Sequence, residues 1–278
     1  NIPDIDETGR RKGRELALRF IDIHTVWLPD KLQTYKDNRG KPRKDLRDWL
    51  EIHPERKDFR NLLRVAMPAK FWVAYNSKDG KLKTEIDTAC LYNFLQLNGF
   101  YALHDENSAV TQFIRIEGNI VKRVNVKDIR EFIRRWVVDR FEDRSILNLV
   151  LNTTKLSPAA LESLQEIDLN FSTCTPDSQY FFFPNKTVEV CRKTEANADG
   201  FKEYEPGSDD LHNYVWEDDV IPHRFKRLPD MFRINKIVAD DGSETLDIDI
   251  LDTRSHFFGY LINTSRLYWR EETEKRFE

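Results

Sequence analysis

The chain has 278 residues, of which 40% are hydrophobic, 12% aromatic and 33% charged. This composition is typical of a folded, charge-coated protein and excludes a disordered or collagen-like chain. With 44 Lys and Arg against 48 Asp and Glu, the formal net charge is −4. No global basic field would therefore hold nucleic acid, and any such contact must come from a local patch.

The cysteine pattern and the hydropathy give an expected location. Cys90, Cys174 and Cys191 are far apart and form no CxxC pair, which favours a reducing, cytoplasmic compartment over a disulfide framework or a zinc site. No apolar run approaches the length of a membrane span, and the start, NIPDIDETGRRKGR, is charged where a signal peptide would be apolar. We expect no membrane partner. Because the chain begins at Asn1 rather than Met, we expect a piece of a longer protein.

The N-terminal part predicts one half of a parallel α/β unit, followed by helices. Apolar spacing predicts a surface helix over residues 8–20, and alternation predicts a strand over residues 21–28. Two more helices are expected over residues 44–51 and 55–67. Residues 76–85 have no apolar period, so we interpret them as an exposed connection at a domain boundary.

The middle of the chain predicts helices around one β-hairpin. Strands are expected over residues 110–116 and 120–124, joined by a tight turn. The predicted helices cover residues 87–98, with Asp87 as N-cap, and residues 127–141, 146–151 and 158–164. This order of elements resembles a winged-helix-like or small α+β unit.

From residue 167 onward, short aromatic and β-branched runs predict mainly β structure. One hairpin is expected over residues 180–190 and another over residues 232–251, turning at a DG pair. A last helix is expected over residues 255–275. The aromatic run Tyr180–Phe183 could be a platform for single-stranded bases, although core packing is the commoner role of such a strand.

Acidic side chains near the N-terminus are candidate metal ligands. Asp4 and Asp6 belong to a DxDxxG run at the start of the first helix. Carboxylates two residues apart at the end of a strand project the same way and can hold a hard cation such as Mg²⁺. A second pair, Asp45 and Asp48, follows where a neighbouring parallel strand would end, so the two pairs could share a metal. Alternatively, these residues only cap helices.

The run PDIDETGRRKGRELALRF, followed by IDIHTVWLP and KDLRDWLE, resembles the second half of a Toprim domain, the metal-binding fold of bacterial-type primases and topoisomerases. The resemblance implies Mg²⁺ or Mn²⁺ bound by Asp4 and Asp6, with Asp45 and Asp48 as an accessory acidic pair. The catalytic Glu of that family lies on an earlier strand, which would precede Asn1. We therefore expect a truncated Toprim unit that is inactive alone.

The later pattern LYNFLQLNGFY, FIRIEGNIVKRVNVKDIREFIRRWV, PDSQYFFFPNKTVEV and VWEDDVIPHRF resembles the linker region of phage and mobile-element primase-helicases. That region precedes a superfamily 3 helicase, although this chain has no GxxxxGK[ST] motif. The resemblance implies a partial Toprim-like domain at residues 1–52, a helical connector at 53–86, a helix/β-hairpin/helix DNA-binding region at 87–165, and a mainly β linker domain at 166–278.

The expected fold class is therefore α/β plus α+β: a partial Toprim-like unit, a winged-helix-like region, and a mainly β region with a C-terminal helix. The implied function lies in DNA replication, in a parent protein that makes primers and unwinds DNA. The implied partners are DNA, nucleoside triphosphates and the helicase domain of the same chain.

Basic side chains in the predicted DNA-binding region are the second candidate site. They are Lys122, Arg123, Arg130, Arg134 and Arg135. Such a stripe beside a hairpin could follow a phosphate backbone, although a charged helix face is more often only solvated. Two alternatives remain: a non-enzymatic nucleic-acid-binding or interaction module, and a structural linker that positions primase against helicase.

Overall fold

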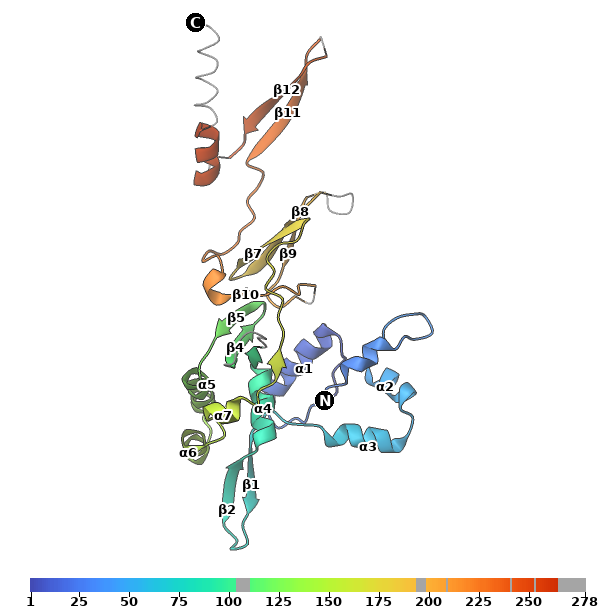
Figure 1. The fold of residues 1–278 in the computed structure, drawn as a ribbon, viewed down its shortest axis with the longest axis vertical. Helices are drawn as coiled ribbons and strands as arrows, with labels where there is room; N and C mark the ends of the chain where they lie inside the picture. The colour runs from blue at the N-terminus through green and yellow to red at the C-terminus, as the bar shows by residue number, and fades with distance from the viewer. Residues whose placement is uncertain (104–110, 194–198, 209, 241, 253, 265–278) are drawn as a thin grey trace. The chain divides into compact units, whose positions relative to one another are not determined.

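The computed structural model describes residues 1–103, 111–193, 199–208, 210–240, 242–252 and 254–264 (Figure 1). The protein is of mixed α/β type, with one mixed parallel and antiparallel sheet and three smaller antiparallel sheets among the described residues. It divides into two compact units, Asn1–Arg224 and Phe225–Glu278.

The N-terminal part of the first unit is helical. It contains α1 (Glu7–Arg19), a 3₁₀ helix η1 (Asp30–Thr34), α2 (Leu46–Ile52) and α3 (Arg56–Arg64), which confirms the three α-helices expected there. These elements enclose a small core of their own, made of Ile5, Val26, Leu28, Leu32, Trp49 and Leu62. The core forms because η1, α2 and α3 each turn apolar residues inward, whereas Ala17 of α1 belongs to the largest core described below.

The strand expected over residues 21–28 is wrong. This segment has no regular secondary structure beyond one isolated antiparallel bridge between Thr25 and Met67. On its other side, the Asn1 amino group donates to the His24 carbonyl oxygen, and the Val26 N–H donates to the Asn1 carbonyl oxygen. Pairing stops after a residue or so on each side, so no ladder forms. The segment is nevertheless buried in part, because Val26 and Leu28 belong to the small N-terminal core.

A five-stranded sheet forms the centre of the first unit, with strand order β10-β5-β4-β3-β6. The strands β3 (Phe100–Leu103), β4 (Gln112–Glu117) and β5 (Ile120–Arg123) are antiparallel neighbours, which confirms the predicted hairpin. The two-residue strands β6 (Glu166–Ile167) and β10 (Val215–Trp216) add in parallel at the edges. The sheet is therefore larger than the winged-helix-like unit that we predicted, because distant segments extend it on both sides.

Asn119, in the turn between β4 and β5, fastens the edge strand β10. Its side chain is buried, donates to the carbonyl oxygens of Leu211 and Asn213 at 3.0 Å each, and accepts from the Gly207 N–H at 2.9 Å. These three hydrogen bonds of the buried amide go to one remote loop and hold Gly207, Leu211 and Asn213 beside the turn.

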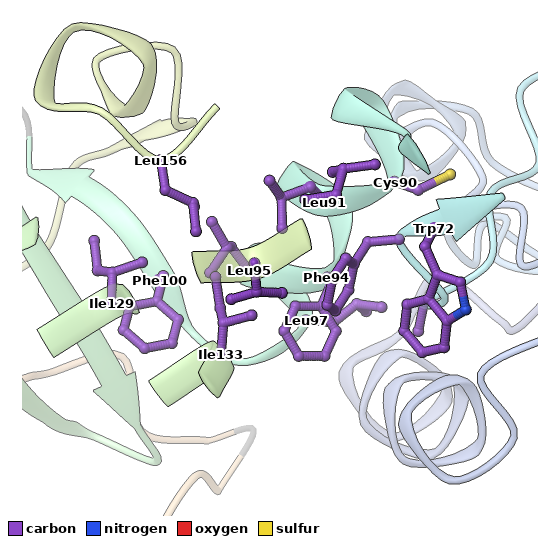
Figure 2. Packing of buried hydrophobic residues seen from close by; sticks show 14 of the residues in the cluster. Trp72, Cys90, Leu91, Phe94, Leu95, Leu97, Phe100, Ile129, Ile133 and Leu156 are labelled. Carbon is purple, nitrogen blue, oxygen red and sulfur yellow. The ribbon is translucent and has the colours of Figure 1, made fainter. Parts of the chain in front are cut away.

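Helices pack around the sheet and form the largest core. They are α4 (Thr88–Leu97), α5 (Val126–Asp139), α6 (Arg144–Asn152) and α7 (Pro158–Leu161), all at predicted positions. Phe94 and Leu95 of α4 are fully buried and belong to one cluster with Phe100 of β3 and Ile133 of α5 (Figure 2). At the end of α4, Gly99 has φ +82°, and a Cβ there would lie 2.3 Å from the Ile116 carbonyl oxygen, so only glycine fits.

The exposed connection expected over residues 76–85 is a hairpin. Strands β1 (Trp72–Asn76) and β2 (Leu82–Ile86) pair along their full length, and Gly80 turns with φ +73°. Apart from Trp72 and Ile86, most of its side chains are exposed. Burial in this hairpin is therefore confined to the end with Trp72 and Ile86, and the charged residues around the turn hide the short alternation of β2 in the sequence.

Two further sheets follow. The first, β7 (Ser178–Phe183), β8 (Lys186–Cys191) and β9 (Phe201–Tyr204), confirms the predicted aromatic hairpin and adds a third strand. The second unit contains β11 (Phe232–Val238) and β12 (Glu244–Ile250), paired as predicted. Residues 256–264 are helical, and the remainder of the helix expected to residue 275 lies outside the described residues.

Candidate functional site

The two carboxylates of the DxDxxG run meet at one ammonium group. Lys44 Nζ lies 2.7 Å from Asp6 Oδ2 and 3.7 Å from Asp4 Oδ2. All three side chains are partly exposed, between 40% and 51%. The carboxylates of Asp4 and Asp6 therefore face one point that solvent can reach. The ammonium group of Lys44 occupies this point.

Backbone contacts explain this convergence. The Ile5 N–H, between the two aspartates, donates to the Lys44 carbonyl oxygen at 2.8 Å, which brings the two segments side by side. Asp6 is also the N-cap of α1, where its Oδ1 accepts from the Gly9 N–H at 2.9 Å. A Cβ on Gly9 would lie 2.6 Å from the Asp4 carbonyl oxygen. The glycine of the motif is thus required by the close approach of α1 to Asp4.

The charges of this cluster stabilise each other. The hydrogen bond from Lys44, followed by that from the Gly9 N–H, holds the pKa of Asp6 below its ordinary value. The same bond to Asp6 raises the pKa of Lys44. Both groups are therefore charged at neutral pH, and a metal ion would have to replace or join the ammonium group between the carboxylates.

The second acidic pair is used in capping α2. Asp45 accepts from the Asp48 N–H at 2.8 Å, and Asp48 Oδ2 accepts from the N–H groups of Lys44 and Asp45 at 2.7 and 3.3 Å. This is a reciprocal capping box. The structure thus brings Lys44 to Asp4 and Asp6, with Asp48 holding the Lys44 backbone. Across the described ranges, no group of three or more His, Cys, Asp or Glu side chains could hold a metal ion.

Asp4 and Asp6 nevertheless suit a divalent cation of the Mg²⁺ type. Such an ion is commonly bound through one or two carboxylates, with water and phosphate oxygens completing its shell. The two partly exposed carboxylates that converge on Lys44 Nζ provide this donor set. Asp45 and Asp48 form no ion pair with Lys44 Nζ, so they do not converge on the same point, and their oxygens instead hold the cap of α2.

No family model, curated protein or solved structure matches the chain. Within the part of the chain that the structure describes, no helix is long and apolar enough to cross a membrane. Arguments about function therefore start from the chemistry of the side chains that the fold brings together.

The predicted DNA-binding cations lie at the surface but have partners. Arg134 donates two hydrogen bonds and Arg135 one to Glu131, all at 2.7 Å, and they lower the Glu131 pKa to about 2. Lys122 pairs with Glu217 at 2.9 Å, and Arg123 lies 3.8 Å from Asp218. The remaining cation, Arg130, donates to the Leu156 carbonyl oxygen at 3.0 Å. A phosphate would have to compete with these carboxylates for most of the predicted stripe.

Another set of cations, on α3, was missed by the sequence reasoning. Arg56, Lys57, Arg60 and Arg64 are exposed and form no ion pair with a described residue. Residues 1–70 hold 17 Lys and Arg against 12 Asp and Glu, although the whole chain is acidic. A count of local charge would have found this part of the chain.

Proposed function

We propose that the chain is a segment of a DNA primase-helicase acting in DNA replication, and that Asp4 and Asp6 bind a divalent cation, Mg²⁺ or Mn²⁺. The convergence of both carboxylates on Lys44 Nζ is the observation that supports the cation site. A divalent ion at this position would stabilise the phosphate charge of a nucleotide during phosphoryl transfer. The positive local charge of residues 1–70 also suits a phosphate-bearing substrate.

In this proposal Lys44 is a stand-in cation. It neutralises the two aspartates when no metal is bound, and the Asp45–Asp48 capping box fixes its backbone. With an ion held by Asp4 and Asp6, Lys44 would be released from the carboxylates and could donate to a phosphate oxygen. Asp45 and Asp48 then act as positioning residues and not as ligands.

Mn²⁺ binding followed by electron paramagnetic resonance tests the proposal. Asp4→Asn and Asp6→Asn should each weaken Mn²⁺ binding about tenfold or more, because each removes one anionic ligand. Asn is as good an N-cap as Asp, so Asp6→Asn preserves the start of α1. Lys44→Met should strengthen Mn²⁺ binding, because the competing ammonium group is gone.

Asp22→Asn is the matched control, since Asp22 is an exposed aspartate paired with a lysine, Lys70, at 2.8 Å. This variant should bind Mn²⁺ like the unaltered protein. Equal Mn²⁺ affinity in all four variants would contradict the metal site and leave the aspartates as helix caps and ion-pair partners.

The second candidate function is a non-enzymatic module that contacts nucleic acid or positions its neighbours. The capping roles of Asp6, Asp45 and Asp48 favour it, because capping needs no ligand. Anisotropy of a labelled DNA separates the two forms of this module. If α5 contacts DNA, Glu131→Gln should strengthen binding by releasing two arginines, and Arg134→Ala with Arg135→Ala should weaken it. Unchanged affinity in both would indicate a structural linker.

A further inference from the structure

An aromatic cleft lies between the edge strand β7 and the segment that contains β10. Its volume is about 420 Å³, within the range of ligand-binding pockets. Aromatic side chains dominate its lining, namely Phe171, Tyr180, Phe181, Phe182, Tyr214 and Trp216. Asp219 is the one charged residue that lines this cleft. The cleft belongs to the first unit and is distinct from the Asp4 and Asp6 cluster.

Trp216 already holds a planar cation. The Arg123 guanidinium carbon lies 3.8 Å from the Trp216 ring centroid, and the Phe171 ring stacks on Trp216 with centroids 4.5 Å and planes 10° apart. Two such close neighbours cannot share a ring face, so Arg123 and Phe171 occupy opposite faces of Trp216. The same guanidinium is 3.8 Å from Asp218. An aromatic face beside a carboxylate thus binds arginine within this chain.

The rim of the cleft also places a carboxylate near aromatic side chains, but this carboxylate has no cation from the described residues bound to it. The 3₁₀ helix η2 (Glu217–Asp219) presents three consecutive carboxylates. Glu217 pairs with Lys122 and Asp218 with Arg123, whereas Asp219 is exposed and has no ion-pair partner among the residues that the structure describes. Phe181, another residue of the lining, is 39% exposed. The cleft therefore offers aromatic surface and an uncompensated negative charge.

We propose that this cleft binds an arginine or lysine side chain from a basic segment of a protein partner. The stem of that side chain would lie along Phe171 and Phe181, and its charged end would reach Asp219. The uncompensated carboxylate of Asp219 would repel a phosphate group, which argues against a nucleic acid strand as the occupant. The inference is independent of the metal site, since none of its residues belongs to that cluster.

A fluorescent hexapeptide with two arginines among glycines, and the same peptide with citrulline in place of arginine, test the inference by anisotropy. Citrulline keeps the shape and removes the charge. The arginine peptide should bind about tenfold more tightly than the citrulline peptide, with affinity that falls as salt rises. Asp219→Asn should weaken arginine-peptide binding about fivefold. Phe171→Leu should weaken the binding of both peptides.

Asp79→Asn is the matched control, because Asp79 is an exposed aspartate in the β1–β2 turn without an ion pair to a described residue. It should leave the affinity unchanged. Equal affinity for the two peptides, or no effect of Asp219→Asn, would overturn the proposal. Tighter binding of a short oligothymidylate that Phe171→Leu abolishes would also overturn it and assign the cleft to nucleobases. Asp219 is exposed and has no ion pair with a described residue, so its variant tests binding without disturbing the fold.

Discussion

Gly9 shows how one residue sets the geometry of the candidate metal site. Gly9→Ala should destabilise the protein by about 1–3 kcal/mol, because the new Cβ would lie 2.6 Å from a backbone oxygen that cannot move aside freely. The loss should exceed the gain of up to about 1 kcal/mol in helix propensity. Urea unfolding measures the difference.

Gly259→Ala is the control for this prediction. Gly259 also lies in a helical segment, but a Cβ there would meet no atom within 4 Å. This change should leave stability equal or higher. Equal effects of the two substitutions would mean that α1 does not press against Asp4.

The stability that α5 gains from its ion pairs depends on pH through the carboxylate of Glu131. Its pKa of about 2 lies below the ordinary value of 4.5, chiefly because Arg134 and then Arg135 donate hydrogen bonds to the carboxylate. A lowered pKa in the folded state means that the stabilisation is complete above pH about 4.5 and is lost as the pH falls toward 2. Carboxyl NMR titration should find this low pKa. Arg134→Ala with Arg135→Ala should return it toward its ordinary value, and a titration near 4.5 in the unaltered protein would contradict the ion pairs.

At the scale of elements, substitutions of the α2 N-cap Asp45 distinguish a structural role of this carboxylate from a role as metal ligand. Asp45→Ala should lower the free energy of unfolding by about 1 kcal/mol, since the first turn of α2 loses its side-chain acceptor. Asp45→Asn should keep stability, because Asn caps equally well. Urea unfolding and Mn²⁺ binding check both. Loss of Mn²⁺ binding in Asp45→Asn without loss of stability would show that Asp45 is a ligand.

Local signals predicted most elements, whereas two strands that depend on distant pairing were missed. Asp87 marked the start of α4 because an N-cap depends on neighbours in sequence. The strands β6 and β10 have two residues each and exist only because β3 and β5 accept them. No period can arise in two residues, so such strands are invisible in a sequence.

The candidate site divides in the same way. The spacing of Asp4 and Asp6 predicted that their carboxylates project the same way, and both do face Lys44 Nζ, although the strand assumed to end there is absent. The position of Lys44 was not predictable, since a backbone bond from Ile5 brings it there across a long loop. Asp45 was weighed as ligand and as cap, and only the placement of Asp48 in space reveals the capping box.

For the whole molecule, the boundary between the two units is open to cleavage. Residues 220–231 form no helix or strand, and Arg224, Lys226 and Arg227 in this stretch are exposed. Brief trypsin treatment should cut first after one of these residues and release a fragment that keeps the first unit. Mass spectrometry and circular dichroism identify the fragment and its helices. Replacing all three residues by Gln should slow this cut, and a first cut within the central sheet would contradict the division.

The late edge strand has a consequence for the order in which the protein is made. On the ribosome, β4 and β5 are synthesised long before Val215 and Trp216 of β10. The Asn119 side chain is likewise made long before its hydrogen-bond acceptors, the carbonyl oxygens of Leu211 and Asn213. Until then the free edge of β5 is open to pairing with other chains, and the amide of Asn119 must be satisfied by water. Nascent chains halted before residue 211 should therefore depend more on chaperones than chains that have passed residue 216.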